Sequence, residues 1–431
     1  MLCKNSLLVL RIVQNIVFLY ILQREINKHN NLKLSIMKKL TALVMAAMLG
    51  VSAFAQQALW GGAQIVSPQV NPDQTVTFRF CGQKAKSVKV MGDFLPGYIV
   101  DMKEGKDGVW EYTTAPLAPN YYCYNFVIDG NKTVDPANVY INRDVATITN
   151  CFIVSKEKDD QGDYYSVNNV PHGTVRKMWY HSNTLNMDRR ITVYTPAGYE
   201  TSKEKYPVFY LLHGAGGDEE AWYTQGRVTQ QLDNLIAEGK AKPMILVMTN
   251  GNAWESAAKG ESAEGFVQPD MRANHGNVME GGFELHFPEV ISFIEKNFRC
   301  KTDKKNRAIA GLSMGSFHSE NISKYYPTKF HYVGLFSGAS VGDGRRGDGA
   351  STCPVYMNFD KQMAAQFSKA NCPALYYIAC GKTDFVMKGV TDLRKYLDEH
   401  NYLYIYNETE GGHIWNNWRV YFTEFSQKIF K

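Results

Sequence analysis

The chain has 431 residues, of which 45% are hydrophobic and 21% are charged. This composition provides enough apolar residues for sizeable cores, and it excludes disordered, collagen-like and small disulfide-scaffold proteins. Residues 1–55 hold seven Lys or Arg and one acid, so residues 56–431 keep 40 basic and 41 acidic residues. A chain this close to neutral is not expected to bind nucleic acid electrostatically.

A targeting segment is predicted near the start of the chain. Residues 37–55 combine a basic start at Met37, an apolar run and the Ala-x-Ala cleavage pattern of residues 53–55, which are the three parts of a secretory signal peptide. We therefore expect export to the periplasm or beyond the cell, and a mature chain without a stable membrane span. Residues 1–36 are then upstream sequence outside the mature protein, and their apolar run over 7–22 is short and polar for a membrane helix.

Residues 56–155 predict a small all-β sandwich, because short runs of alternating polarity recur between turn signals. These runs lie at residues 75–80, 87–91, 109–113, 122–128 and 146–154. The segment resembles the immunoglobulin-like modules of the family 48 carbohydrate-binding type that precede glycan-active enzymes. The resemblance rests on Val90-Met91-Gly92-Asp93-Phe94, on residues 124–130 and on Asp135-Pro136-Ala137-Asn138. It implies either a glycan-binding role or the role of a spacer.

The polar, charged stretch at residues 156–172 is typical of a linker. Over residues 173–431 strands alternate with helices, and near-continuous apolar runs at 206–212 and 244–248 predict strands that are buried on both faces. Further strands are expected at 190–196, 307–311, 332–337, 374–380 and 402–406, and helices at 227–238, 289–298, 315–326 and 420–430. This alternation predicts an α/β fold with a mostly parallel, doubly wound sheet.

Residues 311–315, Gly-Leu-Ser-Met-Gly, fit the pattern Gly-x-Ser-x-Gly between an apolar strand and a helix. On such a sharp turn the flanking glycines let neighbouring backbone approach closely, so that the serine Oγ is exposed. Ser313 is therefore the predicted nucleophile. The alternative is a serine that only shapes the turn.

A serine nucleophile needs a base and an acid. His413 follows Gly411-Gly412 after a predicted strand, where a loop can place its imidazole over the sheet edge, and His213 and His318 are the competing histidines. The acid is expected between the serine and the histidine in chain order. Asp384, after the strand at 374–380 and its turn, is the predicted acid. Four other aspartates compete with it: Asp343, Asp348, Asp360 and Asp392.

The glycine-rich loop His213-Gly214-Ala215-Gly216-Gly217 follows a buried strand, which is where α/β-hydrolases place their second oxyanion donor. The predicted oxyanion hole consists of the backbone N–H groups of Met314 and Gly214, with Ala215 as the alternative to Gly214. A phosphate-binding loop is disfavoured because no Gly-Lys-Ser/Thr follows and the acidic residues 218–220 would repel phosphate.

Residues 173–431 resemble the esterase D group, in particular the feruloyl and acetyl xylan esterases of carbohydrate esterase family one. The matching motifs are residues 210–217 with Trp222, residues 311–315, residues 381–384, and residues 411–415 with Trp418-Arg419. The resemblance implies an α/β-hydrolase fold and a Ser/His/Asp esterase without metal or organic cofactor. The seven scattered cysteines of residues 56–431 contain no Cys-x-x-Cys pair and give no sign of a zinc site. With its N-terminal module, the chain looks like exported esterases of gut Bacteroidetes.

Five residues of predicted loops are candidate substrate contacts: Trp222, Asn252, Trp254, Phe283 and Trp415. We expect an exported carboxylester hydrolase that removes ferulate or a related hydroxycinnamate from feruloylated arabinoxylan. Acetyl xylan and a siderophore triester are the alternative substrates. A glycan-binding protein on an inactive hydrolase scaffold is the alternative from a different functional class. The oligomeric state is left open.

Overall fold

The computed structural model of the chain describes residues 14–20, 65–144, 147–263 and 279–431. Residues 14–20 are helical and belong to a first unit, residues 1–64, whereas residues 65–431 form a second compact unit. The predicted signal peptide at 37–55 lies outside the described residues. Among the helices that the structure describes, none is both long and apolar enough to cross a bilayer.

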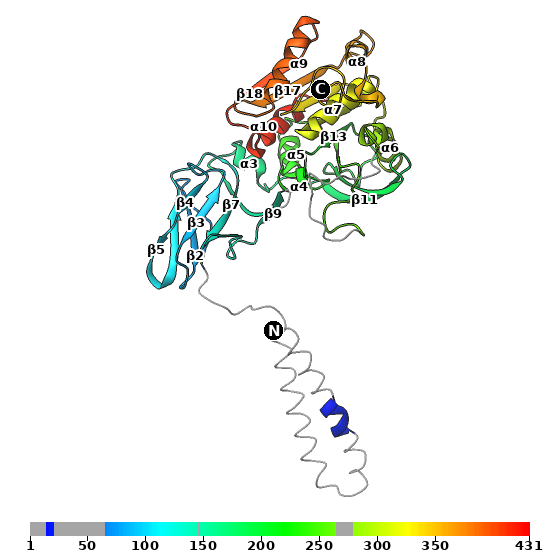
Figure 1. Cartoon of the computed structure of the whole chain (residues 1–431). Coiled ribbons are helices and arrows are strands. Elements are labelled where there is room, and N and C mark those ends of the chain that lie inside the picture. Colours follow the sequence, from blue (N-terminus) through cyan, green and yellow to red (C-terminus); the bar gives the residue numbers. More distant parts are fainter. Residues whose placement is uncertain (1–13, 21–64, 145–146, 264–278) are drawn as a thin grey trace. The chain divides into compact units, whose positions relative to one another are not determined.

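Two antiparallel sheets come first in the second unit, in blue to blue-green in Figure 1. The four-stranded sheet runs in the order β1 (Gln69–Val70), β2 (Val76–Cys81), β6 (Val109–Thr113) and β5 (Lys103–Glu104). The second runs in the order β4 (Ile99–Asp101), β3 (Val88–Gly92), β7 (Asn120–Ile128), β10 (Thr147–Val154) and β9 (Ile141–Asp144), with β8 (Asn131–Thr133) beside β7. Phe78 of the first sheet and Phe126 of the second share one core. The all-β region therefore has the predicted sandwich form.

An eight-stranded sheet follows (Figure 1). Its order is β11 (Thr174–Ser182), β12 (Met187–Thr195), β14 (Ile245–Thr249), β13 (Val208–Leu212), β15 (Arg307–Leu312), β16 (Tyr332–Phe336), β17 (Leu375–Gly381) and β18 (Ile405–Thr409). The strands from β14 to β18 pair in parallel, whereas β12 is antiparallel to both of its neighbours. This arrangement confirms the predicted α/β-hydrolase class.

Helices cover both faces of this sheet. They are α4 (Ala221–Thr224), α5 (Val228–Ala237), α6 (Gly282–Asn297), α7 (Met314–Tyr325), α8 (Phe359–Gln366), α9 (Met387–Glu399) and α10 (Trp415–Ser426). Val208, Tyr210 and Leu212 of β13 pack in one core with α6 to α9, whereas Phe209 and Leu211 pack in the other with α4, α5 and α10. Burial on both faces explains why β13 is apolar at every position.

The predicted linker contains a docked helix, α3 (Gln161–Tyr165). Nδ2 of Asn234, on α5, donates to the backbone carbonyl oxygens of Asp163, Tyr164 and Ser166 at 3.1–3.2 Å. The segment after the sandwich is therefore packed against the α/β domain instead of being a free tether. The rings of Tyr164 and Tyr165 are also buried in the core beside α5. The polar, charged residues around these two tyrosines conceal the helix in the sequence.

Other elements also differ from the prediction. Helices α4, α8 and α9 are not among the predicted helices, and α10 begins at Trp415 instead of residue 420. The edge strand β11 is not predicted because most of its side chains remain at least partly exposed. Helix α6 runs through Pro288 instead of starting after it. Strand β18 spans Ile405–Thr409 and so overlaps only the end of the predicted 402–406 segment. Leu403 is exposed, and the ring of Tyr402 stacks on Phe367 with centroids 4.3 Å apart.

Candidate active site

Ser313 lies on a strained turn between β15 and α7. Its φ of 52° and ψ of −116° fall in a region that residues with a Cβ atom rarely adopt. A Cβ on Gly311 would lie 2.4 Å from the carbonyl oxygen of Gly315, and a Cβ on Gly315 would lie 2.4 Å from that of Leu212. The two glycines are therefore required by the close backbone approach that turns the chain at Ser313, as in a nucleophile elbow.

His413 and Asp384 form a hydrogen-bonded pair in which Nδ1 lies 2.9 Å from Oδ1 and 3.0 Å from Oδ2. The side chain of Asp384 is fully buried and that of His413 is 18% exposed. Burial acts to raise the pKa of Asp384, but hydrogen bonds from His413 and from the Val386 N–H outweigh burial and lower it. An ionised carboxylate facing Nδ1 keeps a proton on that nitrogen and leaves Nε2 free to accept another.

The loop that contains Gly214 runs beside Ser313, since a Cβ on Gly214 would lie 3.3 Å from the Cβ of Ser313. His213 fixes this loop: the Gly251 N–H donates to its Nε2 at 2.7 Å, and its Nδ1 lies 2.7 Å from the Gly214 carbonyl oxygen. Because Nε2 accepts, the proton sits on Nδ1 and is donated to Gly214. Burial lowers the pKa of His213, which favours this neutral form. His213 therefore holds the loop.

Ser313, His413 and Gly214 line one cavity of about 520 Å³. This volume falls within the range of small-molecule sites, roughly 300–1,000 Å³. Several aromatic side chains line it as well, among them Trp415 and Phe385. The ring of Phe385 is 78% exposed, and its centroid lies 4.4 Å from that of the His413 imidazole. The predicted nucleophile, base and second oxyanion donor thus face the same space, and Met314 supplies the first N–H of the helix that follows Ser313.

Only one of the five predicted substrate contacts, Trp415, lines this cavity. Trp222 is buried, and its Nε1 donates to the carbonyl oxygen of Leu212 at 2.9 Å, so it packs beneath the loop. Trp254 is half-buried and is not among the residues that line the cavity. The prediction that Trp222 contacts substrate is therefore corrected to a packing role.

Asn252 and Phe283 are also buried and have internal partners. Nδ2 of Asn252 donates to the carbonyl oxygen of Gly217 at 2.9 Å, so this side chain supports the glycine-rich loop from behind. The ring of Phe283 packs on the imidazole of His318 with centroids 4.5 Å apart. Neither side chain lines the cavity, so neither is placed to touch substrate. The local sequence does not reveal which loop residues turn inward.

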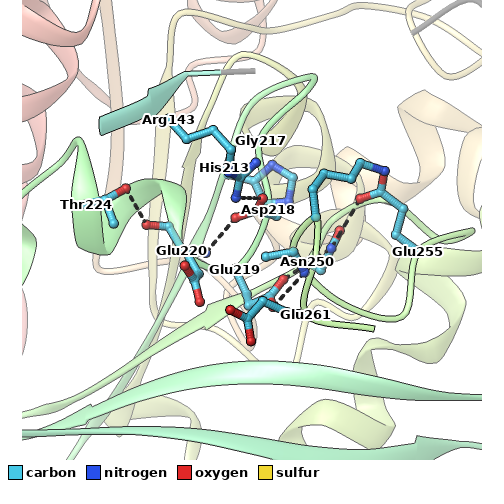
Figure 2. Close-up of polar contacts among 12 residues, drawn as sticks. Arg143, His213, Gly217, Asp218, Glu219, Glu220, Thr224, Asn250, Glu255 and Glu261 are labelled. Carbon is cyan, nitrogen blue, oxygen red and sulfur yellow. Dashed lines mark hydrogen bonds and ion pairs between the residues drawn. The ribbon is translucent and has the colours of Figure 1, made fainter. Parts of the chain in front are cut away.

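The sandwich residues that line the cavity are not predicted from the sequence. Arg143, on β9, pairs with the buried carboxylate of Asp218 at the end of the glycine-rich loop, as Figure 2 shows. Tyr98, which precedes β4, lines the same cavity. The run of acidic residues 218–220 is the one signal that a cation should lie nearby.

One group of carboxylates among the described residues has a spacing that suits a metal ion: Asp159, Asp163 and Glu238. Lys240 lies 3.5 Å from Asp159 and 2.9 Å from Glu238. An ammonium group already compensates their charge, and none of the three lines the cavity of Ser313.

Residues 182–370 match the protein family described as putative esterase. An endo-1,4-beta-xylanase/feruloyl esterase of Xylanibacter ruminicola is 34% identical over 282 residues, which cover 63% of this chain and 36% of that protein. The chain thus spans about a third of the length of that relative. An acetyl esterase of Caldicellulosiruptor saccharolyticus is 23% identical over 243 residues, 52% of this chain and 82% of that protein.

Among solved structures, the enterobactin esterase of Shigella flexneri has a TM-score of 0.56 at 16% identity, covering 82% of this chain and 92% of that one. The fold is that of an α/β-hydrolase. The match of residues 182–370 to the esterase family and the similarity to the Xylanibacter relative, not the likeness of fold, indicate an enzyme of the serine carboxylester hydrolase type.

Proposed function

We propose that this chain is a serine carboxylester hydrolase that releases hydroxycinnamoyl groups, ferulate above all, from plant xylan. One observation carries the proposal: the hydrogen-bonded pair of His413 and Asp384 opens onto the same cavity as Ser313 on its strained turn. Nucleophile, base and acid are thereby available to one bound ester.

In the proposed reaction the Oγ of Ser313 attacks the ester carbonyl carbon while Nε2 of His413 takes the hydroxyl proton. The carbonyl oxygen becomes an oxyanion that accepts hydrogen bonds from the backbone N–H groups of Met314 and Gly214. Loss of one such donor typically costs about 3–4 kcal/mol of transition-state stabilisation.

Collapse of the tetrahedral intermediate breaks the bond to the alcohol, and His413 returns its proton to the leaving alcohol oxygen. Water then attacks the acyl-enzyme with His413 again as base, which releases the carboxylic acid and restores Ser313. Asp384 stabilises the imidazolium in both halves of the reaction and stays ionised.

Two observations favour an aromatic acyl group. Trp415 and the exposed ring of Phe385 line the cavity beside His413, and large aromatic walls suit a planar aromatic ligand. The name of the Xylanibacter relative also includes feruloyl esterase activity. Acetyl xylan is the second candidate, since the Caldicellulosiruptor relative is an acetyl esterase.

We further propose that the protein is exported, because residues 37–55 carry the three parts of a signal peptide. N-terminal sequencing of the protein recovered from the periplasm or medium of an expressing cell is expected to begin at Gln56. Recovery only from the cytoplasm with residues 37–55 intact would contradict this localisation.

A product assay with the purified protein tests the activity. Methyl ferulate, feruloylated arabinoxylan and acetylated xylan are compared, with Ser313→Ala as the blank. The matched control is Ser368→Ala, which changes a half-buried serine outside the cavity. Release of ferulate by the wild type and by Ser368→Ala, but not by Ser313→Ala, supports the proposal. Acetate as the only product would indicate that acetyl xylan is the substrate. Release of neither acid would contradict the proposed function.

A further inference from the structure

Two of the seven cysteines in the described residues lie directly opposite each other in the sandwich. Cys123 on β7 and Cys151 on β10 are partners in the antiparallel register of these strands. Side chains in such positions are neighbours on the same face of the sheet. Cys151 is 7% exposed and belongs to a core that also contains residues of α5 and α10, and Cys123 packs against that core. The two thiols therefore enter the same apolar environment.

The backbone hydrogen bonds show which kind of pair the two cysteines form. The N–H of Cys151 donates to the carbonyl oxygen of Tyr140 at 3.0 Å, and its own carbonyl oxygen accepts from Nδ2 of Asn138 at 3.0 Å. Both partners precede β9, on the side away from β7. The N–H of Cys123 donates to Oδ1 of Asp93 at 3.3 Å. The two cysteines therefore form a non-hydrogen-bonded pair, in which Cα atoms lie only about 4.5 Å apart.

This spacing suits a disulfide bond, because disulfides join Cα atoms about 4.4–6.8 Å apart. Two other cysteines lie on strands, and neither has a cysteine opposite. Cys81 is opposite Val109 on β6, and Cys380 is opposite Glu408 on β18. Among the strands that the structure describes, the register thus brings two cysteines together only on β7 and β10.

The cysteine pair lies beside the candidate active site. Cys123 lines the cavity of Ser313 and His413. Two residues earlier on β7, the carbonyl oxygen of Tyr121 accepts from Nη1 of Arg419, on α10, at 2.9 Å. Arg419 is 1% exposed, and its guanidinium lies 4.7 Å from the centroid of the Tyr121 ring. A covalent bond between β7 and β10 would therefore fix the strand that carries this contact between the sandwich and the α/β domain.

We propose that Cys123 and Cys151 form a cross-strand disulfide when the protein folds in an oxidising compartment, and that this bond clamps the wall of the cavity. The inference rests on the proposed export, because structural disulfides form and persist outside the cytoplasm. It does not depend on the proposed reaction at Ser313.

The oxidant is the disulfide of a thiol oxidoreductase or of oxidised glutathione. The thiolate of one cysteine attacks a sulfur of that disulfide, which gives a mixed disulfide and releases the first thiolate of the oxidant. The thiolate of the second cysteine then attacks the sulfur of the first cysteine and releases the other thiolate. Two electrons pass to the oxidant, and the two protons of the cysteine thiols convert it into two thiols.

Burial decides when this exchange takes place. It raises the pKa of Cys123 to about 12 and also raises the pKa of Cys151. Because the thiolate is the attacking species, the folded protein reacts slowly, and the bond forms while β7 and β10 pair during folding. The same burial then shields the bond from external thiols.

The test follows the cysteines of the full chain through refolding. The reduced protein is unfolded in guanidinium chloride, refolded with reduced and oxidised glutathione, alkylated in denaturant and digested without reduction. Mass spectrometry is expected to show Cys123 linked to Cys151, with the exposed Cys81 and Cys372 not joined to another cysteine. Alkylation of both Cys123 and Cys151, or their linkage to other cysteines, would overturn the inference. The mapping requires no ester hydrolysis and no export, so its outcome is separate from those of the proposed function.

A thermal melt tests the clamp. The wild type refolded with glutathione should melt about 3–10 °C above the same protein refolded in excess reductant. Cys123→Ala should melt at one temperature after both treatments. Cys81→Ala, which removes an exposed cysteine of the same sandwich, is the matched control and should keep the wild-type difference. A difference that is absent from the wild type, or that persists in Cys123→Ala, would contradict the clamp, and the peptide mapping remains decisive if Cys123→Ala does not fold.

Discussion

Replacing Asp384 by asparagine tests the proposed assignment of the acid. In the native pair both carboxylate oxygens lie 2.9–3.0 Å from Nδ1 of His413, and the carboxylate is fully buried. An asparagine keeps the shape of the side chain but loses the charge. If its amide group faces Nδ1, it donates to that nitrogen, the imidazole proton moves to Nε2, and the base can no longer accept from Ser313.

The size of the effect follows from two losses: Asp384 no longer keeps the imidazole proton on Nδ1, and it no longer stabilises the imidazolium by its charge. We expect kcat to fall about 10⁴-fold, which corresponds to about 5 kcal/mol in the activation barrier. The assay is the initial rate on methyl ferulate at saturation, with a thermal melt to verify the fold. Asp392→Asn, which changes an exposed aspartate paired with Lys388 on α9, is the matched control and should keep the wild-type rate. A kcat for Asp384→Asn within tenfold of the wild type would refute the assignment.

Three further changes test the scaffold of the site. Gly315→Ala places a methyl group 2.4 Å from the carbonyl oxygen of Leu212. Urea denaturation should therefore show a loss of about 1–3 kcal/mol in the free energy of unfolding. An unchanged midpoint of denaturation would contradict the requirement for glycine at this turn. Arg143→Met leaves the carboxylate of Asp218 buried without its cation and should lower the free energy of unfolding by about 1–3 kcal/mol. The double variant Arg143→Met/Asp218→Asn should regain most of this loss. Equal losses in the single and double variants would contradict the coupling of Arg143 with Asp218. Burial, followed by the charge of Asp218, raises the pKa of Glu219 to about 7, so its contribution to stability is present below pH 4.5 and is lost as the pH rises through 7. Glu219→Gln should therefore lose less stability than the wild type between pH 5 and 8, and parallel stability curves would contradict the pKa shift.

Local patterns predict the parts of the fold and of the site that depend on local physics. The continuous apolar run of β13 predicts a strand covered by helices on both faces, and the two glycines around Ser313 predict a close backbone approach. The spacing of turn residues after β17 and β18 predicts where Asp384 and His413 lie. The structure brings these two side chains together and places Ser313 on the same cavity.

What the sequence does not predict depends on contacts between distant segments. Trp222 and Phe283 are aromatic residues of the kind that often line pockets. Only the packing reveals that their side chains turn into the core. Arg143 lies 75 positions from its partner Asp218 in the chain, and no local pattern joins them. The contribution of the sandwich to the cavity is therefore visible only in three dimensions.

The most direct test of the account is to trap the acyl-enzyme. The protein is mixed with a feruloyl ester, quenched in acid within the first turnover and digested, and the peptides are identified by mass spectrometry. We predict a feruloyl group on the Oγ of Ser313 that is absent from Ser313→Ala. Acylation of a different residue, or ferulate release by Ser313→Ala at the wild-type rate, would contradict the central claim that Ser313 is the nucleophile.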